Sequence, residues 1–547
     1  MHTSQGVTPP DENMGEHKSK TPVRAQMPSK LRSFLHLLLV VLAVLLGAYL
    51  RFHNLRTSPA WYSDEGSNIL ISAALARGEM SYMAVGQSSF INGHPHLFYI
   101  ILAAVFRLQG VDILWARLLS ASLGLAGLLL IYPVSSRITD RRTALIATTL
   151  YSFYPGGVSF TRMAFTYSLL TPLYLIGLYS IYRWVEQRQT LWAIAAALCS
   201  GLALITDLAA IALLALLLLA LVSKHPRQLL MAIPVTILPI LCWGWWAWSR
   251  GGDAFLYDLR FTLSRTDAPL AVQLARIVVY YYNALSWDLW FALGSLGLLL
   301  LPSRASRGLV GGFFFGSLLI IMRTVNVGGP SYYFLIPYHP FICLGIATLV
   351  LKGLPLITET FESDLHSLLA PCIPKLRWRR VPVLLINSAL LFVLLISPFL
   401  VGLYEATSLT SIPVARLASY GLLADPDTAT RATAYINNHT SARDTVLAAP
   451  TIAWQIDAQV ADFQMAVAAA GHDSYHLPGD VPPSRFLFNP RLENATYVIL
   501  DPVWRGWASQ TMTEVEEMVA LVEEEWTLEQ QFGEFEIYRN PNRVPDG

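Results

Sequence analysis

The chain has 547 residues, of which 54% are hydrophobic and only 14% charged, a composition unlike that of water-soluble proteins. The formal net charge of +1 gives no general attraction for nucleic acid, so no nucleic-acid partner is expected. The apolar residues form continuous blocks near the length that crosses a bilayer core of ~30 Å, which predicts membrane-spanning helices and excludes an alternating β-barrel pattern.

The N-terminal segment precedes the first apolar block. Residues 1–32 are polar and basic without an apolar face, so we expect a disordered cytoplasmic N-terminus. The block 33–50 lacks a clear small-x-small cleavage site, which favours an uncleaved signal anchor over a signal peptide. If the basic N-terminus stays in the cytoplasm, residues 51–111 form an outer loop.

Further apolar blocks predict about eleven spans in total. After the first, they cover 112–134, 143–158, 165–182, 190–205, 207–223, 229–249, 284–301, 308–322, 333–351 and 381–403. The connections that then face the cytoplasm all hold Arg or Lys, as the positive-inside rule requires. If residues 94–110 crossed the membrane, the basic residues of the next connection would face outward and break this pattern. We therefore expect a helix along the outer interface there. The sequence therefore predicts a transmembrane domain over 33–403.

The tail, residues 404–547, has a different composition. Charged residues return, and strand-like segments at 445–450, 496–501 and 535–539 alternate with helical ones at 427–438 and 510–526. The predicted fold is mostly α, a polytopic membrane helical bundle with a small C-terminal extracytoplasmic α/β domain. In this tail Asp425 and Asp427 match an Asp-x-Asp nucleotide signature, but they open a helix, and we expect helix capping.

Two adjacent carboxylates, Asp64 and Glu65, begin a helical run in the outer loop, directly after Trp61 and Tyr62. One interpretation is a helix N-terminus at which Ser63 or Asp64 caps and Glu65 meets the helix dipole. The other is a functional site, because an ionisable group at a membrane edge is costly to desolvate unless it is paired.

The outer loops also hold more arginine than the charge rule predicts. These residues are Arg51, Arg56, Arg77, Arg107, Arg162, Arg250, Arg260, Arg265 and Arg276. Contact of their side chains with lipid headgroups explains part of this set. Arginines beside carboxylates also suit a site that binds a phosphate and needs a base.

Several short motifs together resemble a known superfamily. They are Asp64-Glu65 after the first span, Gly93-His94-Pro95 followed by Leu97-Phe98-Tyr99, Gly110, Arg117-Leu118, Tyr154-Pro155, Arg162, and Ser331-Tyr332-Tyr333 with Pro337 and Pro340. This pattern is similar to the dolichyl-phosphate-mannose protein mannosyltransferase-like superfamily, which includes the aminoarabinose lipid A transferases and other membrane glycosyltransferases of the GT-C fold. The resemblance covers the whole chain as a pattern and is close over the first ~200 residues.

The resemblance implies roles for individual residues. Asp64 would be the general base, and Glu65 would support it or help to hold the acceptor. His94 and Arg162 would lie near the donor phosphate. Asp207 departs from the family, in which a Lys often follows the corresponding Gly-rich span, and this departure leaves open how the phosphate is held.

The donor implied is a polyprenyl-phosphate sugar, a hexose or pentose carried by a lipid. Its departing phosphate requires cationic groups, for which Arg260 and Arg265 are further candidates. We expect Trp61, Tyr62, His96, Tyr332 and Tyr333 to line the substrate cavity. The segment 250–283 is expected to be flexible and to close over the donor, with Gly251 and Gly252 as a hinge.

The predicted reaction is a single inverting displacement onto an extracytoplasmic acceptor, which could be a protein, a lipid or a glycan. The predicted partners are therefore the lipid-linked sugar, the acceptor and membrane lipid. The sequence requires no cofactor: Asp64, Glu65, His94 and His96 could hold a divalent metal but have no diagnostic ligand spacing. The alternatives are a transporter or flippase of a lipid-linked saccharide, which predicts charges at mid-span, and a catalytically degenerate membrane-anchored interaction protein.

Overall fold

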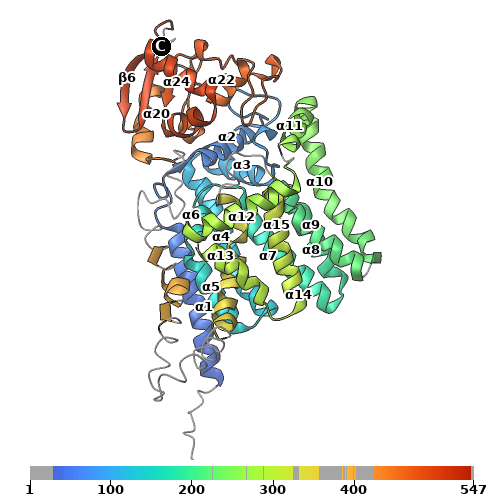
Figure 1. Ribbon diagram of the computed structural model, residues 1–547. Helices are drawn as coiled ribbons and strands as arrows, with labels where there is room; N and C mark the ends of the chain where they lie inside the picture. Colours follow the sequence, from blue (N-terminus) through green and yellow to red (C-terminus); the bar gives the residue numbers. More distant parts are fainter. Residues whose placement is uncertain are drawn as a thin grey trace, which may run out of the picture.

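The computed structural model describes residues 29–543 apart from 225, 266–267, 288, 324–331, 356–384, 386–387, 390, 398–399 and 402–422. Three layers are visible (Figure 1): a bundle of helices, a thin layer formed by α2 and α3, and an α/β unit that contains the C-terminus. Most of the predicted disordered N-terminus lies outside the described residues. The prediction is wrong for its last residues, because α1 already begins at Ser29.

The bundle contains most of the helices. They are α1 (Ser29–Phe52), α4 (Ile113–Ile138), α5 (Arg141–Phe153), α6 (Pro155–Thr161), α7 (Tyr167–Gln187), α8 (Thr190–Leu204), α9 (Ile211–Lys224), α10 (Leu229–Gly251), α12 (Leu270–Trp287), α13 (Leu289–Gly297), α14 (Arg304–Ser306), α15 (Gly312–Ile321) and α16 (His339–Thr348). Short 3-10 turns η2 (Leu208–Ala210) and η6 (Tyr332–Tyr338) precede α9 and α16. The predicted spans at 112–134, 165–182, 190–205 and 229–249 coincide with helices to within a few residues.

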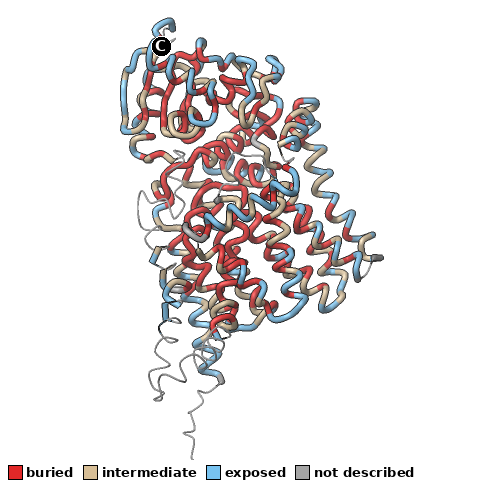
Figure 2. The backbone as a smooth tube through the Cα atoms, in the orientation of Figure 1, coloured by how far each residue is buried: buried red, intermediate tan, exposed pale blue. Residues whose placement is uncertain are grey.

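The bundle belongs in a membrane. Five described helices are long and apolar enough to cross a bilayer, and the bent pair Leu270–Ala284 and Leu289–Leu300 would make a sixth. The apolar window of α10 is only 11% buried, and its exposed side chains include Leu238, Leu241 and Trp245. Figure 2 shows such exposed positions along the outer helices around a buried interior. Apolar surface of this extent requires lipid contact, so the chain is a multi-pass membrane protein; the count of eleven spans stays a prediction.

The segment 250–283 differs from its prediction. Its described residues form two helices, α11 (Asp253–Ser264) and α12, so they are not a flexible loop. Gly252 has φ +53° between α10 and α11, a backbone angle that favours glycine. The glycine pair is therefore a fixed turn between helices. The predicted span 284–301 covers the end of α12 and all of α13, and the two helices are bent by 118° relative to each other.

The middle layer is formed by two helices that follow the first span. α2 (Ser63–Arg77) packs on α3 (Leu97–Gln109), and the hydroxyl of Tyr99 donates a hydrogen bond of 3.1 Å to Asn68 between them. The helix predicted over 94–110 thus forms as α3. Its place between bundle and α/β unit agrees with an interfacial position.

The C-terminal α/β unit, residues 423–543, is built on a five-stranded sheet. Its elements are β2 (Leu423–Ala424), α20 (Pro426–His439), β3 (Thr445–Leu447), α21 (Pro450–Ala453), β4 (Gln459–Ala461), α22 (Phe463–Ala469), β5 (Tyr497–Leu500), α23 (Ser509–Thr511), α24 (Thr513–Glu525), β6 (Thr527–Phe532) and β7 (Phe535–Arg539). The strand order is β4-β3-β5-β7-β6, with β4, β3 and β5 parallel and β6, β7 antiparallel. The three predicted strands are confirmed, and Asp425 caps α20 as expected.

The carboxyl edge of the parallel strands is docked on α2. β1 (Trp61–Tyr62) pairs antiparallel with β2, and the ring of Trp61 lies 5.2 Å from that of Trp454. A Cβ added at Gly66 would lie 1.9 Å from the carbonyl oxygen of Pro450 at the start of α21. Only glycine permits this approach, so the sequence places the α/β unit directly over the helix that carries Asp64.

Candidate active site

Asp64 lies in the first turn of α2, directly after the extended strand β1. The N-cap residue is Tyr62, and it makes no side-chain capping bond, so the capping role considered for Ser63 or Asp64 is wrong. The Asp64 carboxylate accepts a hydrogen bond from the hydroxyl of Tyr333. Loss of water raises the pKa of Asp64, while the Tyr333 hydrogen bond and the nearby His94 partly oppose this rise. A carboxyl group in this setting suits a proton acceptor.

Both carboxylate oxygens of Glu65, the residue after Asp64, accept hydrogen bonds inside the protein. Its oxygens accept from Nε and Nη2 of Arg117 at 2.8 and 2.6 Å, and Oε1 also accepts from the Ala164 backbone N–H at 2.9 Å. The Glu65 side chain is 1% exposed and that of Arg117 is 0% exposed. The predicted contact of Glu65 with an acceptor does not fit this geometry. The pair instead fixes the start of α2, and with it Asp64.

His94 is paired with the residue that departs from the family pattern. Its Nδ1 lies 2.9 Å from Oδ2 of Asp207, and its Nε2 lies 3.5 Å from the hydroxyl of Tyr167. Oδ1 of Asp207 accepts from the backbone N–H of Ala209, which holds the carboxylate at the start of η2. The imidazole therefore has a fixed orientation, and its side chain remains 21% exposed.

An aromatic wall borders Asp64 and His94. Tyr333 stacks on Phe165 at 4.9 Å and 10°, and its ring lies 5.8 Å from that of Tyr62 and 5.7 Å from that of Tyr167. Of the predicted cavity residues, Tyr62 and Tyr333 belong to this wall. Trp61 instead packs toward the α/β unit, and the side chain of Tyr332 lies outside the described part of the chain.

Arg265 follows α11 and lies near the same aromatic wall, where Tyr333 influences it. Its Nη1 lies 3.3 Å from Nδ1 of His476 in the α/β unit. Burial lowers the pKa of Arg265 while the adjacent Tyr333 opposes this effect; burial, Arg265 and His94 lower the pKa of His476 to about 3. Arg265 is therefore close to both Tyr333 and His476, and His476 is in turn close to His94. Arg260, also on α11, is exposed.

Two predicted site residues are internal anchors. Arg162 is fully buried, and its Nη2 donates to the carbonyls of His53 and of Ser58, the latter at 2.9 Å. Its predicted phosphate contact does not fit, because the guanidinium secures the connection between α1 and β1.

His96 is likewise enclosed. Its Nδ1 accepts from the indole N–H of Trp243 at 3.1 Å, so its Nε2 carries the hydrogen and donates to Ser89 Oγ at 2.9 Å. Burial lowers the pKa of His96 to about 3. The predicted place of His96 in the cavity is wrong because both ring nitrogens bind inside the protein.

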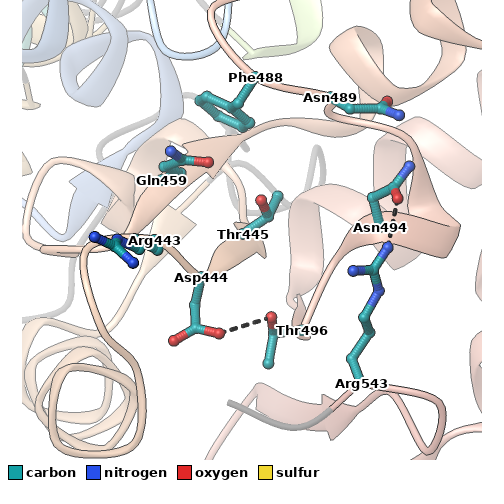
Figure 3. A pocket seen from close by; sticks show the side chains of 9 residues that line it. All are labelled: Arg443, Asp444, Thr445, Gln459, Phe488, Asn489, Asn494, Thr496 and Arg543. Carbon is teal, nitrogen blue, oxygen red and sulfur yellow. Dashed lines mark hydrogen bonds between the residues drawn. The ribbon is translucent and has the colours of Figure 1, made fainter. Parts of the chain in front are cut away.

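A separate pocket lies in the α/β unit and is lined mainly by polar side chains (Figure 3). It sits at the amino ends of β3 and β4, near Thr445 and Gln459, whereas α2 meets the carboxyl ends of the strands. In it Asp444 accepts from Thr496 at 3.1 Å. This pocket is therefore not part of the cluster around Asp64. Among the described residues, no group of three or more His, Cys, Asp or Glu side chains could hold a metal ion.

The sequence analysis does not name Tyr167 or His476 as site residues, and it names Asp207 only as a departure from the family pattern. Asp207 pairs with His94 across 113 positions and His476 meets Arg265 across 211, so no local motif links them. Asp207 did carry a signal, because the resemblance implies a Lys near this position.

Comparison with known proteins agrees with the fold. Residues 93–248 match the model of the dolichyl-phosphate-mannose-protein mannosyltransferase family. A search of curated proteins gives no match. The structure of ArnT from Cupriavidus metallidurans bound to undecaprenyl phosphate is similar at 14% identity with a TM-score of 0.58, over 95% of this chain and 100% of that chain.

The apo structure of the same ArnT also has a TM-score of 0.58 at 14% identity, over 93% of this chain and 98% of that one. The oligosaccharyltransferase of Archaeoglobus fulgidus tethered to an acceptor peptide aligns at 13% identity over 90% of this chain and 72% of that one, with a TM-score of 0.49. The chain therefore has the fold of a GT-C membrane glycosyltransferase, and its residues 93–248 carry the sequence pattern of the dolichyl-phosphate-mannose-protein mannosyltransferase family.

Proposed function

We propose that this chain transfers a sugar from a polyprenyl-phosphate donor to an extracytoplasmic acceptor by a single inverting displacement, with Asp64 as the base. The observation that carries the proposal is the position of Asp64, a carboxyl group with a raised pKa in the first turn of α2, bonded to Tyr333 and near His94, with Arg265 on the other contact of Tyr333. ArnT, which has the same fold, binds undecaprenyl phosphate, and this supports a lipid-phosphate donor.

In the proposed step, each bond that forms is matched by a bond that breaks. The acceptor hydroxyl oxygen bonds to the anomeric carbon as its proton passes to Asp64, and the bond from that carbon to the phosphate oxygen breaks with its electron pair staying on the phosphate. One displacement inverts the anomeric carbon, so no covalent sugar-enzyme intermediate is needed. The charge that remains on the phosphate requires cationic neighbours in a partly dry site.

His94 and Arg265 are the groups suited to that phosphate. When protonated, His94 can donate from Nδ1 to Asp207 and from Nε2 toward a phosphate oxygen. Arg265 adds a second cationic group, next to Tyr333. The aromatic wall of Tyr62, Tyr167 and Tyr333 would then contact the sugar and the start of the lipid chain.

Replacement of Asp64 by Asn tests the proposal. Wild-type protein in proteoliposomes should release polyprenyl phosphate from at least one donor of a panel of polyprenyl-phosphate hexoses and pentoses, supplied with an acceptor extract. D64N should lose transfer by at least about 100-fold, since a positioned general base contributes 10²–10⁴-fold. The control is E79Q, which removes an exposed carboxylate paired with Arg77 just after α2. Equal turnover in D64N and wild type would remove the proposed base.

The orientation belongs to the same proposal: the N-terminus would be cytoplasmic and the α/β unit extracytoplasmic. A cysteine at the exposed Glu524 of α24, in a background without the native cysteines, should react with an impermeant thiol reagent in intact cells. A cysteine at the exposed Arg141, the first residue of α5, should react only after lysis. The reverse pattern of labelling would invert the orientation and place Asp64 on the wrong side for this reaction.

A further inference from the structure

Helix α11 is fastened to the α/β unit by one segment, residues 474–486. Arg485 makes a buried two-point ion pair with Asp258, with both distances 3.1 Å and exposures of 3% and 1%. The hydroxyl of Tyr257 donates to Asp480 one residue earlier on the helix. Because a buried ion pair is costly to break, α11 and this segment move as one body.

The same segment reaches the candidate site through His476. Its backbone N–H donates to Oε1 of Gln464 at 2.9 Å, and Ser474 and Leu477 on either side bond to each other through backbone and side chain. These bonds fix the imidazole in front of Arg265. The segment thus connects the sheet of the α/β unit to a group that faces Tyr333 and, through it, Asp64.

The chemistry of the contact defines the protonation of His476. An arginine can only donate, so Nδ1 of His476 accepts, and the ring must be neutral with its hydrogen on Nε2. The low pKa of His476, about 3, agrees with a neutral ring at physiological pH. A neutral acceptor orients the guanidinium without cancelling its charge, whereas a carboxylate at this place would compete with an incoming phosphate.

We infer that His476 is a positioning residue of the donor-phosphate site: it holds Arg265 toward the lipid phosphate, and the C-terminal α/β unit is thereby an integral part of that site. The inference rests on the proposed function, because it names the partner that orients the phosphate-binding arginine. It also assigns the α/β unit a role that is separate from any binding of the acceptor.

The test measures binding of undecaprenyl phosphate to full-length protein in detergent, which needs no knowledge of the sugar. H476L removes the acceptor and should weaken the Kd by about 10-fold to 100-fold, the range for a hydrogen bond to a charged group. H476N places an amide oxygen where Nδ1 lies and should stay within about threefold of wild type. The control is H472L, two residues before this segment, at a 58% exposed side chain that faces Glu514, and its Kd should not change.

The outcomes separate this inference from the proposed function. Wild-type binding by H476L, or equal loss in H476L and H476N, would overturn the role of His476. If H476L does not fold, H476Q replaces it, because its longer amide puts the oxygen beyond the Nδ1 position and should lose binding where H476N keeps it. R265L should bind as weakly as H476L; weak binding by R265L alone rejects His476 and leaves the function in place. Retained transfer by D64N rejects the function itself.

Discussion

The pair Glu65 and Arg117 gives the most discriminating prediction, since two adjacent carboxylates should respond differently to removal. Glu65 is 1% exposed and bonded to Arg117 and to the Ala164 N–H. R117M would leave the Glu65 carboxylate buried with one remaining donor. Removing one partner of a buried ion pair costs about 3–5 kcal/mol.

E65Q should be milder. The Gln amide oxygen can still accept from Arg117, and the guanidinium keeps its bonds to the carbonyls of Leu55, Pro59 and Ala60. The expected cost is that of one weakened charged hydrogen bond, about 1–3 kcal/mol. The gap between the two variants is therefore about 2 kcal/mol, or roughly 30-fold in the ratio of folded to unfolded protein.

The assay combines thermal unfolding in detergent, followed by tryptophan fluorescence, with sugar transfer at a temperature where every variant is folded. We expect apparent Tm values in the order wild type, E65Q, R117M, and transfer by E65Q within about tenfold of wild type, in contrast to D64N. A normal Tm for E65Q with abolished transfer would refute the structural role assigned here and place the Glu65 carboxylate in the chemistry.

Two further predictions concern the surroundings of Asp64. Y333F removes a hydrogen bond that stabilises the Asp64 carboxylate, so the pKa of Asp64 should rise and the acid limb of the pH–rate profile should move to higher pH; an unchanged limb would contradict this contact. G66A places a methyl group against the carbonyl oxygen of Pro450 and should make the α/β unit more sensitive to limited proteolysis. The control G244A, where the added methyl group has no atom within 4 Å, should not change this sensitivity. Equal sensitivity of the two variants would contradict the close approach.

The elements predicted from sequence were those with a strong local signal. Continuous apolar runs identified α4, α7, α8 and α10, and short strand-like segments between helical ones identified the three strands of the tail. The segment 250–283 was misjudged because its charges and glycines are typical of a loop. Asp258 of α11 pairs with Arg485 in the α/β unit, 227 positions later in the chain. No pattern in the sequence alone indicates that partner.

The candidate site was predictable only in part, for a related reason. Asp64 and His94 stood out as ionisable groups in an outer loop, and the structure brings them together. Arg162 and His96 looked equally suitable in the sequence. In the structure, however, Arg162 donates to backbone carbonyls, and His96 bonds to Trp243 and Ser89. Residue type and position give a list of candidates, whereas burial and partners, which depend on distant parts of the chain, decide which candidates remain open to substrate.

The contact between the outer loop and the C-terminal α/β unit also sets an order of assembly. Gly86 bonds through its backbone to Arg485, which is 399 residues away. At 5–20 residues per second, the ribosome takes roughly 20–80 s to deliver the second half of this contact after the first. Throughout that interval the nascent chain has its first helices, but the α/β unit does not yet cover α2. The candidate site around Asp64 is therefore complete only once the last part of the polypeptide has been made and has docked on α2.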